Sequence, residues 1–299
     1  MPAVDPATLA RLERVLGSIP SAAQRLGGQH GVRHYRLTLA DGSSAFAKVH
    51  NPNSSGNVAV DLDAARQFAA EAAGLRWLAE AGAVPVPAVL AIDENCLVIE
   101  WIADSGGASK EVAARFGRDL ARLHRAGADA FGAPWPGVIA GLPLPNDQAD
   151  TWPDWYAANR LLPYVRIARD AGALSGADVR LVEAAAARSS QLAGPAEPAS
   201  RIHGDCWSGN VLWSGGRGWL IDPAAHGGHR ETDLAMLALF GAPNQDQILA
   251  GYTEAAPLAD GWRGRVPLHQ LHPLLVHVCL FGQAYRDAAL NTARQVLAS

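Results

Sequence analysis

Hydrophobic and polar positions in the first third of the chain predict an antiparallel sheet followed by one long helix. Residues 35–39 and 44–49 are strand-like runs on either side of an Asp-Gly pair, which is typical of a hairpin. Residues 58–82 follow a helical period and end on a glycine stop. The prolines of residues 84–87 indicate an extended segment, and residues 96–102 form a short apolar run. We expect that run to be a further strand.

The rest of the chain predicts mainly helices. Apolar residues recur at helical spacing within 113–123 and again within 234–240. Residues 132–154 are rich in Pro, Gly and Trp, which favours a long irregular loop. Strands first and helices afterwards predict an α+β, bilobal fold. We place an N-terminal nucleotide-binding lobe at 1–100 and a C-terminal catalytic and substrate-binding lobe at 101–299.

Composition narrows the class of protein. The chain has 299 residues, a formal net charge of -4 and 49% hydrophobic residues, so it carries no electrostatic footprint for nucleic acid. Cys96, Cys206 and Cys279 are widely spaced, which argues against a disulfide framework and against a cysteine-based zinc site. A reducing cytoplasm is therefore the expected location.

No segment of the sequence predicts export or membrane insertion. Charged residues from Asp5 to Arg14 interrupt the apolar run that an export signal needs, and they favour a short surface helix. Residues 268–285 lack formal charges but contain Pro273, three histidines and two glutamines, which argues against a membrane span. We expect a soluble protein with no membrane partner, either a monomer or a homodimer.

The segment His203-Gly204-Asp205 and the Asn210 that follows it suggest phosphoryl transfer. This reaction needs a carboxylate that orients the attacking hydroxyl and takes its proton, together with oxygen ligands for Mg²⁺. The spacing from Asp205 to Asn210 equals that from the catalytic Asp to the metal-binding Asn in the kinase pattern H-R-D-x-x-x-x-N. We interpret Asp205 as the base and Asn210 as a magnesium ligand.

A hairpin after this segment would supply the second magnesium ligand. Residues 211–213 and 219–221 are short apolar runs on either side of a five-residue linker, 214–218. If residue 213 faces 219, Asn210 faces Asp222 across an antiparallel pair. The predicted register therefore brings an amide oxygen and a carboxylate together.

Lys48 and Glu71 are candidates for a nucleotide site. Lys48 is one of only two lysines, and its strand would present the ammonium group to phosphate oxygens. Glu71 falls on the apolar stripe of the predicted helix, where a carboxylate needs a positive partner. The glycine-rich segment 26–32, with Gly28 and Gly31, is either a phosphate-binding loop or an ordinary turn.

These segments together resemble the fructosamine kinase (ketosamine 3-kinase) family, whose relatives are aminoglycoside and choline kinases. The resemblance runs nearly end to end. Its most specific part is residues 221–236, IDPAAHGGHRETDLAM, which follow the HGDCWSGNVLW segment at 203–213. Residues 46–48, 71–75, 97–101 and 160–163 also match. One departure is Gln29-His30-Gly31, which stands where the family usually has Ser-Ile-Asn.

The resemblance implies a protein-kinase-like fold that uses ATP and Mg²⁺ to phosphorylate the 3-hydroxyl of a ketosamine. The substrate would be a fructosamine, ribulosamine or erythrulosamine, either small or protein-bound, and the phosphorylated adduct would decompose and free the amine. By similarity Asp205 is the base, and Asn210 and Asp222 are the magnesium ligands. Lys48 would form an ion pair with Glu71, and the backbone from Glu100 to Ile102 would contact adenine. Asp233 would hold the catalytic loop in place.

Five further residues are candidates for substrate contacts. Trp207 follows the base, and His229 and Arg230 follow the metal-binding Asp222. Asn146 and Arg160 lie on the segment expected to wall the cleft. Tryptophan and arginine at such positions are also common in cores and on surfaces, so each remains a hypothesis.

Three other functions compete with this interpretation. One is a kinase of the same fold that acts on an aminoglycoside, choline or homoserine. Another is a nucleotide-binding pseudokinase. The third is a metal-dependent hydrolase with His203, His226 and His229 as ligands. Measured turnover and a substrate screen would separate them.

Overall fold

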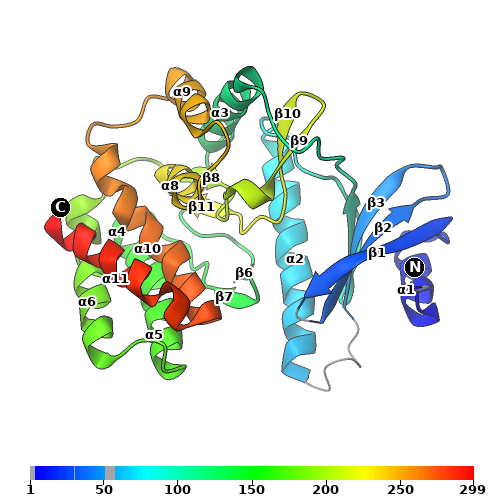
Figure 1. The fold of residues 1–299 in the computed structure, drawn as a ribbon, viewed down its shortest axis with the longest axis horizontal. Helices are drawn as coiled ribbons and strands as arrows, with labels where there is room; N and C mark the ends of the chain where they lie inside the picture. The colour runs from blue at the N-terminus through cyan, green and yellow to red at the C-terminus, as the bar shows by residue number, and fades with distance from the viewer. Residues whose placement is uncertain (1–3, 30, 51–57) are drawn as a thin grey trace.

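A five-stranded sheet occupies one end of the molecule and a group of helices the other, with the long helix α2 between them (Figure 1). The computed structural model describes residues 4–29, 31–50 and 58–299. The elements of the sheet part are α1 (Pro6–Leu16), β1 (Ala22–Gln29), β2 (Val32–Thr38), β3 (Ser44–His50), α2 (Val58–Glu80), β4 (Val89–Asp93) and β5 (Cys96–Glu100).

The remaining chain is mainly helical, with three two-stranded pairs inserted. Its elements are α3 (Lys110–Arg125), β6 (Gly137–Ile139), β7 (Leu142–Leu144), α4 (Trp152–Tyr156), the π-helical turn η2 (Ala157–Leu161), α5 (Leu162–Asp170), α6 (Gly176–Ala186), α7 (Ser189–Leu192), β8 (Ser200–Ile202), the 3-10 turn η3 (Ser208–Asn210), β9 (Val211–Ser214), β10 (Arg217–Leu220), β11 (His226–Gly228), α8 (Glu231–Phe240), α9 (Gln245–Ala255), α10 (Trp262–Phe281) and α11 (Gln283–Ala298).

The sheet has the strand order β1-β2-β3-β5-β4, and every neighbouring pair is antiparallel. The predicted hairpin is present between β2 and β3. In its turn, the Asp41 carboxylate accepts hydrogen bonds from the Ser43 backbone and hydroxyl at 2.9 and 2.6 Å, and Gly42 has a φ of +84°. The sheet, the following helix and the helical remainder confirm the predicted α+β fold.

Both faces of the sheet are covered, and this decides which way the β3 side chains point. On one face Ala47 and Val98 pack with Leu12 of α1. On the other face Leu97 packs with Phe68 of α2. Because successive side chains of a strand alternate between faces, Lys48 lies on the α2 side, opposite to its neighbour Ala47.

Helices α3 and α9 cross at glycines. A Cβ on Gly117 would lie 1.9 Å from the carbonyl oxygen of Ile248, and one on Gly251 would lie 2.0 Å from that of Ala114. The two backbones therefore approach as closely as glycine allows. This contact places the Tyr252 hydroxyl of α9 against the α3 side chain that enters the site described below.

The predicted boundary near residue 100 coincides with the end of β5, but the hydrophobic core continues past it. One buried cluster joins Phe68 and Leu75 of α2 with Phe116 of α3, Trp213 of β9 and Leu237 of α8. The division at 1–100 and 101–299 stays a prediction.

Residues 132–154 are more regular than expected. The β6–β7 hairpin and the start of α4 lie within this segment, and two isolated bridges join its Ala149 to Phe131 and its Gly132 to Gly227. The prediction of one long irregular loop was wrong because three-residue strands leave too short a pattern to be recognised. Among the described helices, none combines the length and the apolar character that crossing a bilayer requires.

Candidate active site

The loop that carries Asp205 is held from below by Asp233, the third residue of α8. The Asp233 carboxylate accepts hydrogen bonds from the backbone of His203 at 2.7 Å and of Gly204 at 2.9 Å, and it contacts His124 Nε2 at 3.1 Å. His124 is fixed in turn by the Tyr252 hydroxyl at 2.8 Å. The geometry agrees with the role in bracing this loop that the sequence suggested for Asp233.

Asp205 projects from this braced loop and bonds to Asn210. The Asn210 amide nitrogen donates to the Asp205 backbone oxygen at 2.9 Å and to its carboxylate at 3.0 Å. Burial raises the pKa of Asp205 to about 7, the Asn210 bond opposes this rise, and the charges of Asp222 and Asp233 add to it. A carboxyl with a pKa near neutrality can accept a proton and release it again.

The β9–β10 hairpin has a register one residue away from the predicted one. Ser214 pairs with Arg217, and the turn is the two residues Gly215 and Gly216, with φ of +56° and +69°. Two consecutive glycines at positive φ close a tight two-residue hairpin, so no five-residue linker is needed. Asn210 consequently faces Ile221, whose backbone N–H donates to the Asn210 backbone oxygen at 3.1 Å.

Asp222 lies one residue beyond this pairing and turns toward Lys48. Its φ of +52° is in the left-handed region, so the chain leaves the ladder there. The predicted face-to-face position of Asn210 and Asp222 was therefore wrong in register. Both residues nevertheless lie at the same end of the hairpin, because Ile221 is bonded to Asn210 and directly precedes Asp222.

The ammonium group of Lys48 is shared by two carboxylates. It lies 2.7 Å from Glu71 Oε2 and 2.7 Å from Asp222 Oδ1. Burial disfavours the charged form of Lys48, but the two carboxylates outweigh burial and hold its pKa above its ordinary value. For Asp222, partial removal of the carboxylate from water raises the pKa and Lys48 outweighs that effect, so its pKa is below normal. Burial raises the pKa of Glu71, against the attraction of Lys48.

Oxygen atoms suited to a divalent cation occur at this edge. Asn210 uses its amide nitrogen toward Asp205, which leaves its amide oxygen as a ligand. The Asp222 side chain is 45% exposed although Lys48 holds one of its oxygens. Amide and carboxylate oxygens are the hard ligands that Mg²⁺ prefers, so the donor set fits that ion.

The glycine-rich segment is a strand rather than the expected turn. Gly27 and Gly28 belong to β1 and pair with His34 and Arg33 of β2. A Cβ on Gly28 would lie 2.2 Å from the Val32 oxygen, so the close approach of these strands requires glycine there. Gly31, with φ of +79°, follows in the connection to β2. His30 lies outside the described residues, and the phosphate-binding role of this segment stays a prediction.

The segment expected to meet adenine begins where β5 ends. The Glu100 N–H donates to the Ala88 oxygen at 2.9 Å and the Trp101 N–H to the Ser44 oxygen at 3.4 Å. Within the described part of the chain, the backbone of Ile102 makes no hydrogen bond to other backbone groups. The geometry leaves that residue able to bond a ligand.

Among the substrate candidates, Trp207 is the one that lies on the same loop as Asp205. It follows Asp205 by two residues, its N–H donates to the Asp205 backbone oxygen at 3.1 Å, and 39% of its surface is exposed. The indole lies over Gly209, where a Cβ would approach the ring to 2.2 Å. Trp207 is therefore exposed on the loop that carries Asp205, and its contact with substrate stays a prediction.

Asn146 and Arg160 bond to each other instead of lining a cleft. The Arg160 guanidinium donates to the Asn146 side-chain oxygen at 2.8 Å and stacks over the Trp155 ring at 4.4 Å. Both residues are buried, and Arg160 lies in the π-helical turn η2 and not in an irregular segment. Their expected contact with substrate is not supported by this geometry, because the guanidinium is already enclosed.

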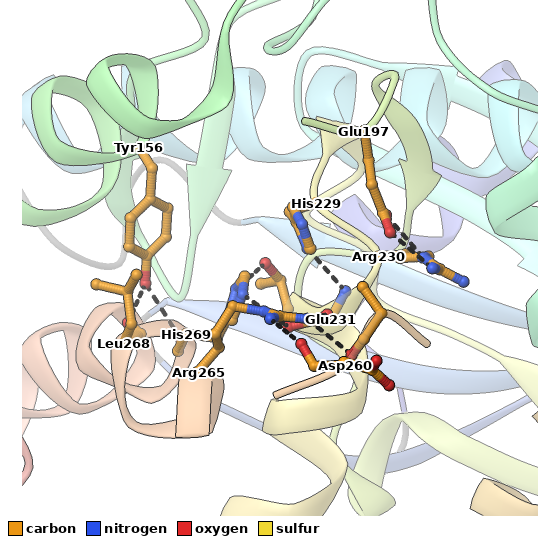
Figure 2. Close-up of polar contacts among 11 residues, drawn as sticks. Tyr156, Glu197, His229, Arg230, Glu231, Asp260, Arg265, Leu268 and His269 are labelled. Carbon is orange, nitrogen blue, oxygen red and sulfur yellow. Dashed lines mark hydrogen bonds and ion pairs between the residues drawn. The ribbon is translucent and has the colours of Figure 1, made fainter. Parts of the chain in front are cut away.

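His229 and Arg230 also hold structure together (Figure 2). Arg230 makes a two-bond ion pair with Glu197, at 2.7 and 2.6 Å. The His229 ring accepts a hydrogen bond from the Glu231 N–H at 3.2 Å and lies 4.9 Å from the Trp152 ring. Burial lowers the pKa of His229 to about 3. Both side chains stabilise the start of α8, so neither is placed to face a sugar.

The three histidines of the hydrolase alternative do not form a metal centre. His203 Nε2 is 2.9 Å from the Ile221 oxygen, and His226 Nδ1 is 2.7 Å from the Ala224 oxygen. His229 lies instead near two other potential ligands, Glu231 and His269, whose ligand atoms lie within 4.8 Å of one another.

The Arg265 guanidinium already binds the carboxylate of the group formed by His229, Glu231 and His269. Arg265 donates to both oxygens of Glu231, at 2.9 and 2.5 Å (Figure 2). A metal ion there would have to displace Arg265 or lie beside its charge in a buried site. The geometry therefore does not support the hydrolase alternative.

Two residues near the site were not identified as functional from the sequence. His124 lies on the inward face of α3, and a polar residue on that apolar stripe was the signal available. Asp104 follows the end of β5, and the Trp213 N–H donates to its carboxylate at 2.8 Å. Only the folded chain brings Asp104 next to β9.

Comparisons with known proteins found relatives over most of the chain. A family model described as fructosamine kinase matches residues 28–299. A "probable ketoamine kinase" of Synechocystis sp. is 34% identical over 249 residues, which cover 80% of this chain and 82% of that protein. Another, from Escherichia coli strain K12, is 31% identical over 237 residues, which cover 78% and 81% of the two chains.

Solved structures give the same result. The crystal structure of a provisionally assigned fructosamine-3-kinase from Thermobifida fusca has a TM-score of 0.91 at 48% identity and covers 99% of this chain and 100% of that one. An aminoglycoside phosphotransferase solved in complex with gentamicin shares the fold, with a TM-score of 0.63 at 14% identity and coverage of 100% and 98%.

Proposed function

The chain belongs to the fructosamine kinase family, and from this premise we propose that it transfers the γ-phosphoryl group of ATP to the 3-hydroxyl of a ketosamine. A ketosamine is the rearranged adduct of a sugar and an amine. The phosphorylated adduct would decompose and release the amine, so the proposed activity is a deglycation.

One observation carries the proposal: a braced carboxylate and a lysine–carboxylate group meet at the same edge of one hairpin. Asp205 is tied to Asn210 at 3.0 Å, and Asp222 is tied to Lys48 at 2.7 Å. Asn210 precedes the β9–β10 hairpin and Asp222 follows it, so both lie at its open end. The charge of Asp222 raises the pKa of Asp205. Phosphoryl transfer needs this combination of a proton acceptor, a cation and oxygen ligands.

Asp205 is the proposed base. It would accept a hydrogen bond from the 3-hydroxyl and take its proton as the phosphoryl group is transferred. The Asn210 amide holds the carboxylate in place, and Asp233 holds the loop from beneath. With both supports in place, little reorganisation is needed when the hydroxyl arrives.

The nucleotide would lie between the sheet and this loop. Lys48 would contact phosphate oxygens, with Glu71 keeping its ammonium group in position. The backbone near Ile102 would meet adenine, and Gly28 and Gly31 would allow the backbone to approach the phosphates. Bound Mg²⁺ would neutralise charge on the phosphates, and Asn210 and Asp222 are the residues that would hold it.

An ADP-release assay across candidate acceptors tests this function. We expect turnover with ribulosamine, fructosamine or erythrulosamine adducts and none with an aminoglycoside, choline or homoserine. Turnover with one of those alcohols, but with no ketosamine, would assign the chain to another substrate. Nucleotide binding without turnover of any acceptor would identify a pseudokinase.

A further inference from the structure

A cavity lies beside Trp207, on the face of β9 that carries Val211 and Trp213. Its volume is about 270 Å³, and its wall comes from the loop after β5, the loop that carries Asp205, β9, and the chain from the end of α8 to the start of α9. Leu237 and Ile248 make its inner part apolar. A space of this size is below the usual range for drug-sized ligands, roughly 300 to 1,000 Å³, and suits a short alkyl chain.

One charged group stands on this wall. Asp104 is the single ionisable residue among the described residues that line the cavity. Its carboxylate accepts the Trp213 N–H at 2.8 Å through Oδ1, and the neighbouring Ser105 donates to the Trp213 oxygen from both its N–H and its hydroxyl at 2.7 Å. These three bonds fix Asp104 against β9. An apolar cavity with one fixed carboxylate is complementary to an alkylammonium group.

Trp207 connects this cavity with the reacting centre. The residue lines the cavity, and its backbone N–H donates to the Asp205 backbone oxygen at 3.1 Å. Its indole, 39% exposed, offers an aromatic face to a cation. In a ketosamine the amine nitrogen is attached to C1 and the acceptor hydroxyl to C3, so the nitrogen must lie close to the base as well.

We propose that this cavity binds the amine part of the ketosamine, with the substituted ammonium group between Asp104 and the Trp207 ring and its alkyl chain against Leu237 and Ile248. This inference rests on the proposed ketosamine activity. It adds a specificity-determining residue, Asp104, for the amine part of that substrate.

A binding experiment tests the cavity without any phosphoryl transfer. Butylammonium and butanol are titrated into the wild-type protein and followed by ligand-observed NMR. Since a hydrogen bond to a charged group is stronger than one between neutral groups, we expect the wild type to bind the ammonium roughly tenfold more tightly than the alcohol. Asp104→Asn should remove this preference. The asparagine oxygen can still accept the Trp213 N–H, so the loop keeps its anchor.

Asp287→Asn is the matched control. It makes the same chemical change at a side chain of α11 that is 86% exposed and lies outside the cavity, so it should bind both probes like the wild type. Equal affinity of the wild type for butylammonium and butanol, or a preference that survives Asp104→Asn, overturns the proposal.

Kinetics with a matched pair of substrates then places the amine during turnover. The pair is 1-deoxy-1-butylaminofructose and 1-O-butylfructose, which share the acceptor hydroxyl and differ in the charged nitrogen. Asp104→Asn should raise KM roughly tenfold for the amine and leave KM for the ether and both kcat values unchanged. An equal change in KM for both compounds contradicts the proposal.

The two experiments distinguish failure of the cavity from failure of the proposed function. An ammonium preference that depends on Asp104, combined with no phosphorylation of any ketosamine, would refute the proposed ketosamine activity and leave an amine-binding cavity. Phosphorylation of both substrates with no effect of Asp104→Asn would support the activity and refute the inference.

Discussion

Replacing Asp233 by asparagine changes the carboxylate that supports the turn ahead of Asp205. In the structure one oxygen accepts the Gly204 N–H at 2.9 Å, and the other accepts the His203 N–H at 2.7 Å and contacts His124 at 3.1 Å. An asparagine has one acceptor oxygen and one amide nitrogen. Whichever way it is oriented, its nitrogen faces a backbone N–H, so at least one of these bonds is lost.

The magnitude follows from the bonds that are lost. A hydrogen bond to a charged group contributes about 1.5 to 3 kcal/mol, and one or two are removed. A buried backbone N–H that is left without an acceptor costs about 1 to 3 kcal/mol. We therefore expect Asp233→Asn to lower the free energy of unfolding by about 3 kcal/mol. Because the free energy of unfolding of an ordinary domain is about 5 to 15 kcal/mol, the variant should still fold.

The effect on catalysis is a separate expectation. A displaced His203-Gly204 turn moves Asp205 from its position beside Asn210, and a misplacement of about 1 Å costs roughly 100-fold in rate. We expect kcat to fall by about this factor while KM for ATP changes little, since Asp233 lies beneath the loop. Urea unfolding measures the stability, and steady-state ADP release measures kcat.

A buried aspartate elsewhere separates lost stability from lost positioning. Asp178 lies in α6, a helix that carries none of the proposed site residues. Its carboxylate accepts the Ser175 N–H at 2.8 Å and pairs with Arg286 at 2.7 Å. Asp178→Asn should lose comparable stability with no change in kcat. If Asp233→Asn retains the kcat of this control, the bracing of Asp205 by Asp233 is refuted.

Three further predictions concern the reacting groups. Asp205→Ala should fold normally and still bind ATP but lose kcat by orders of magnitude, since the base is removed while the groups that bind nucleotide remain; turnover near the wild-type value would contradict the role of Asp205. Because the pKa of Asp205 is raised to about 7 by burial, its carboxyl is neutral at lower pH, so kcat/KM for the acceptor should fall about tenfold per pH unit below roughly pH 7; a flat profile from pH 5 to 8 would contradict this assignment. Lys48→Met leaves Glu71 and Asp222 without their shared cation, so kcat/KM for ATP should fall at least about tenfold; an unchanged value, with ATP binding measured by titration, would show that Lys48 does not contact the nucleotide.

The local pattern of the sequence was sufficient for the main elements. Alternation in residues 44–49 and helical spacing in 58–82 predicted β3 and α2, because each element exposes a periodic face to one core. The ion pair of Lys48 and Glu71 followed from the same patterns: each side chain was placed on the inward face of its element, and the structure joins them at 2.7 Å.

The hairpin that ends at Asp222 shows where local pattern was insufficient. The apolar runs at 211–213 and 219–221 were identified, yet the register was wrong by one residue. Register depends on the conformation of Gly215 and Gly216, which take up positive φ at no steric cost. The sequence contains several glycines in this turn and does not state which of them adopt that conformation.

Contacts between distant segments decided the rest of the site. From the sequence, Arg230 and Arg160 were candidates for substrate contact. In the fold the Arg230 guanidinium pairs with Glu197, and the Arg160 guanidinium bonds to Asn146. Asp104 has no distinctive neighbours in the sequence and becomes part of a cavity wall only through β9. From the sequence came the residues able to do the chemistry and the elements that carry them. Packing decided which charges are neutralised inside the protein and which stay available to a ligand. The physical reason is that a buried charge is costly unless an opposite charge or hydrogen bonds compensate it.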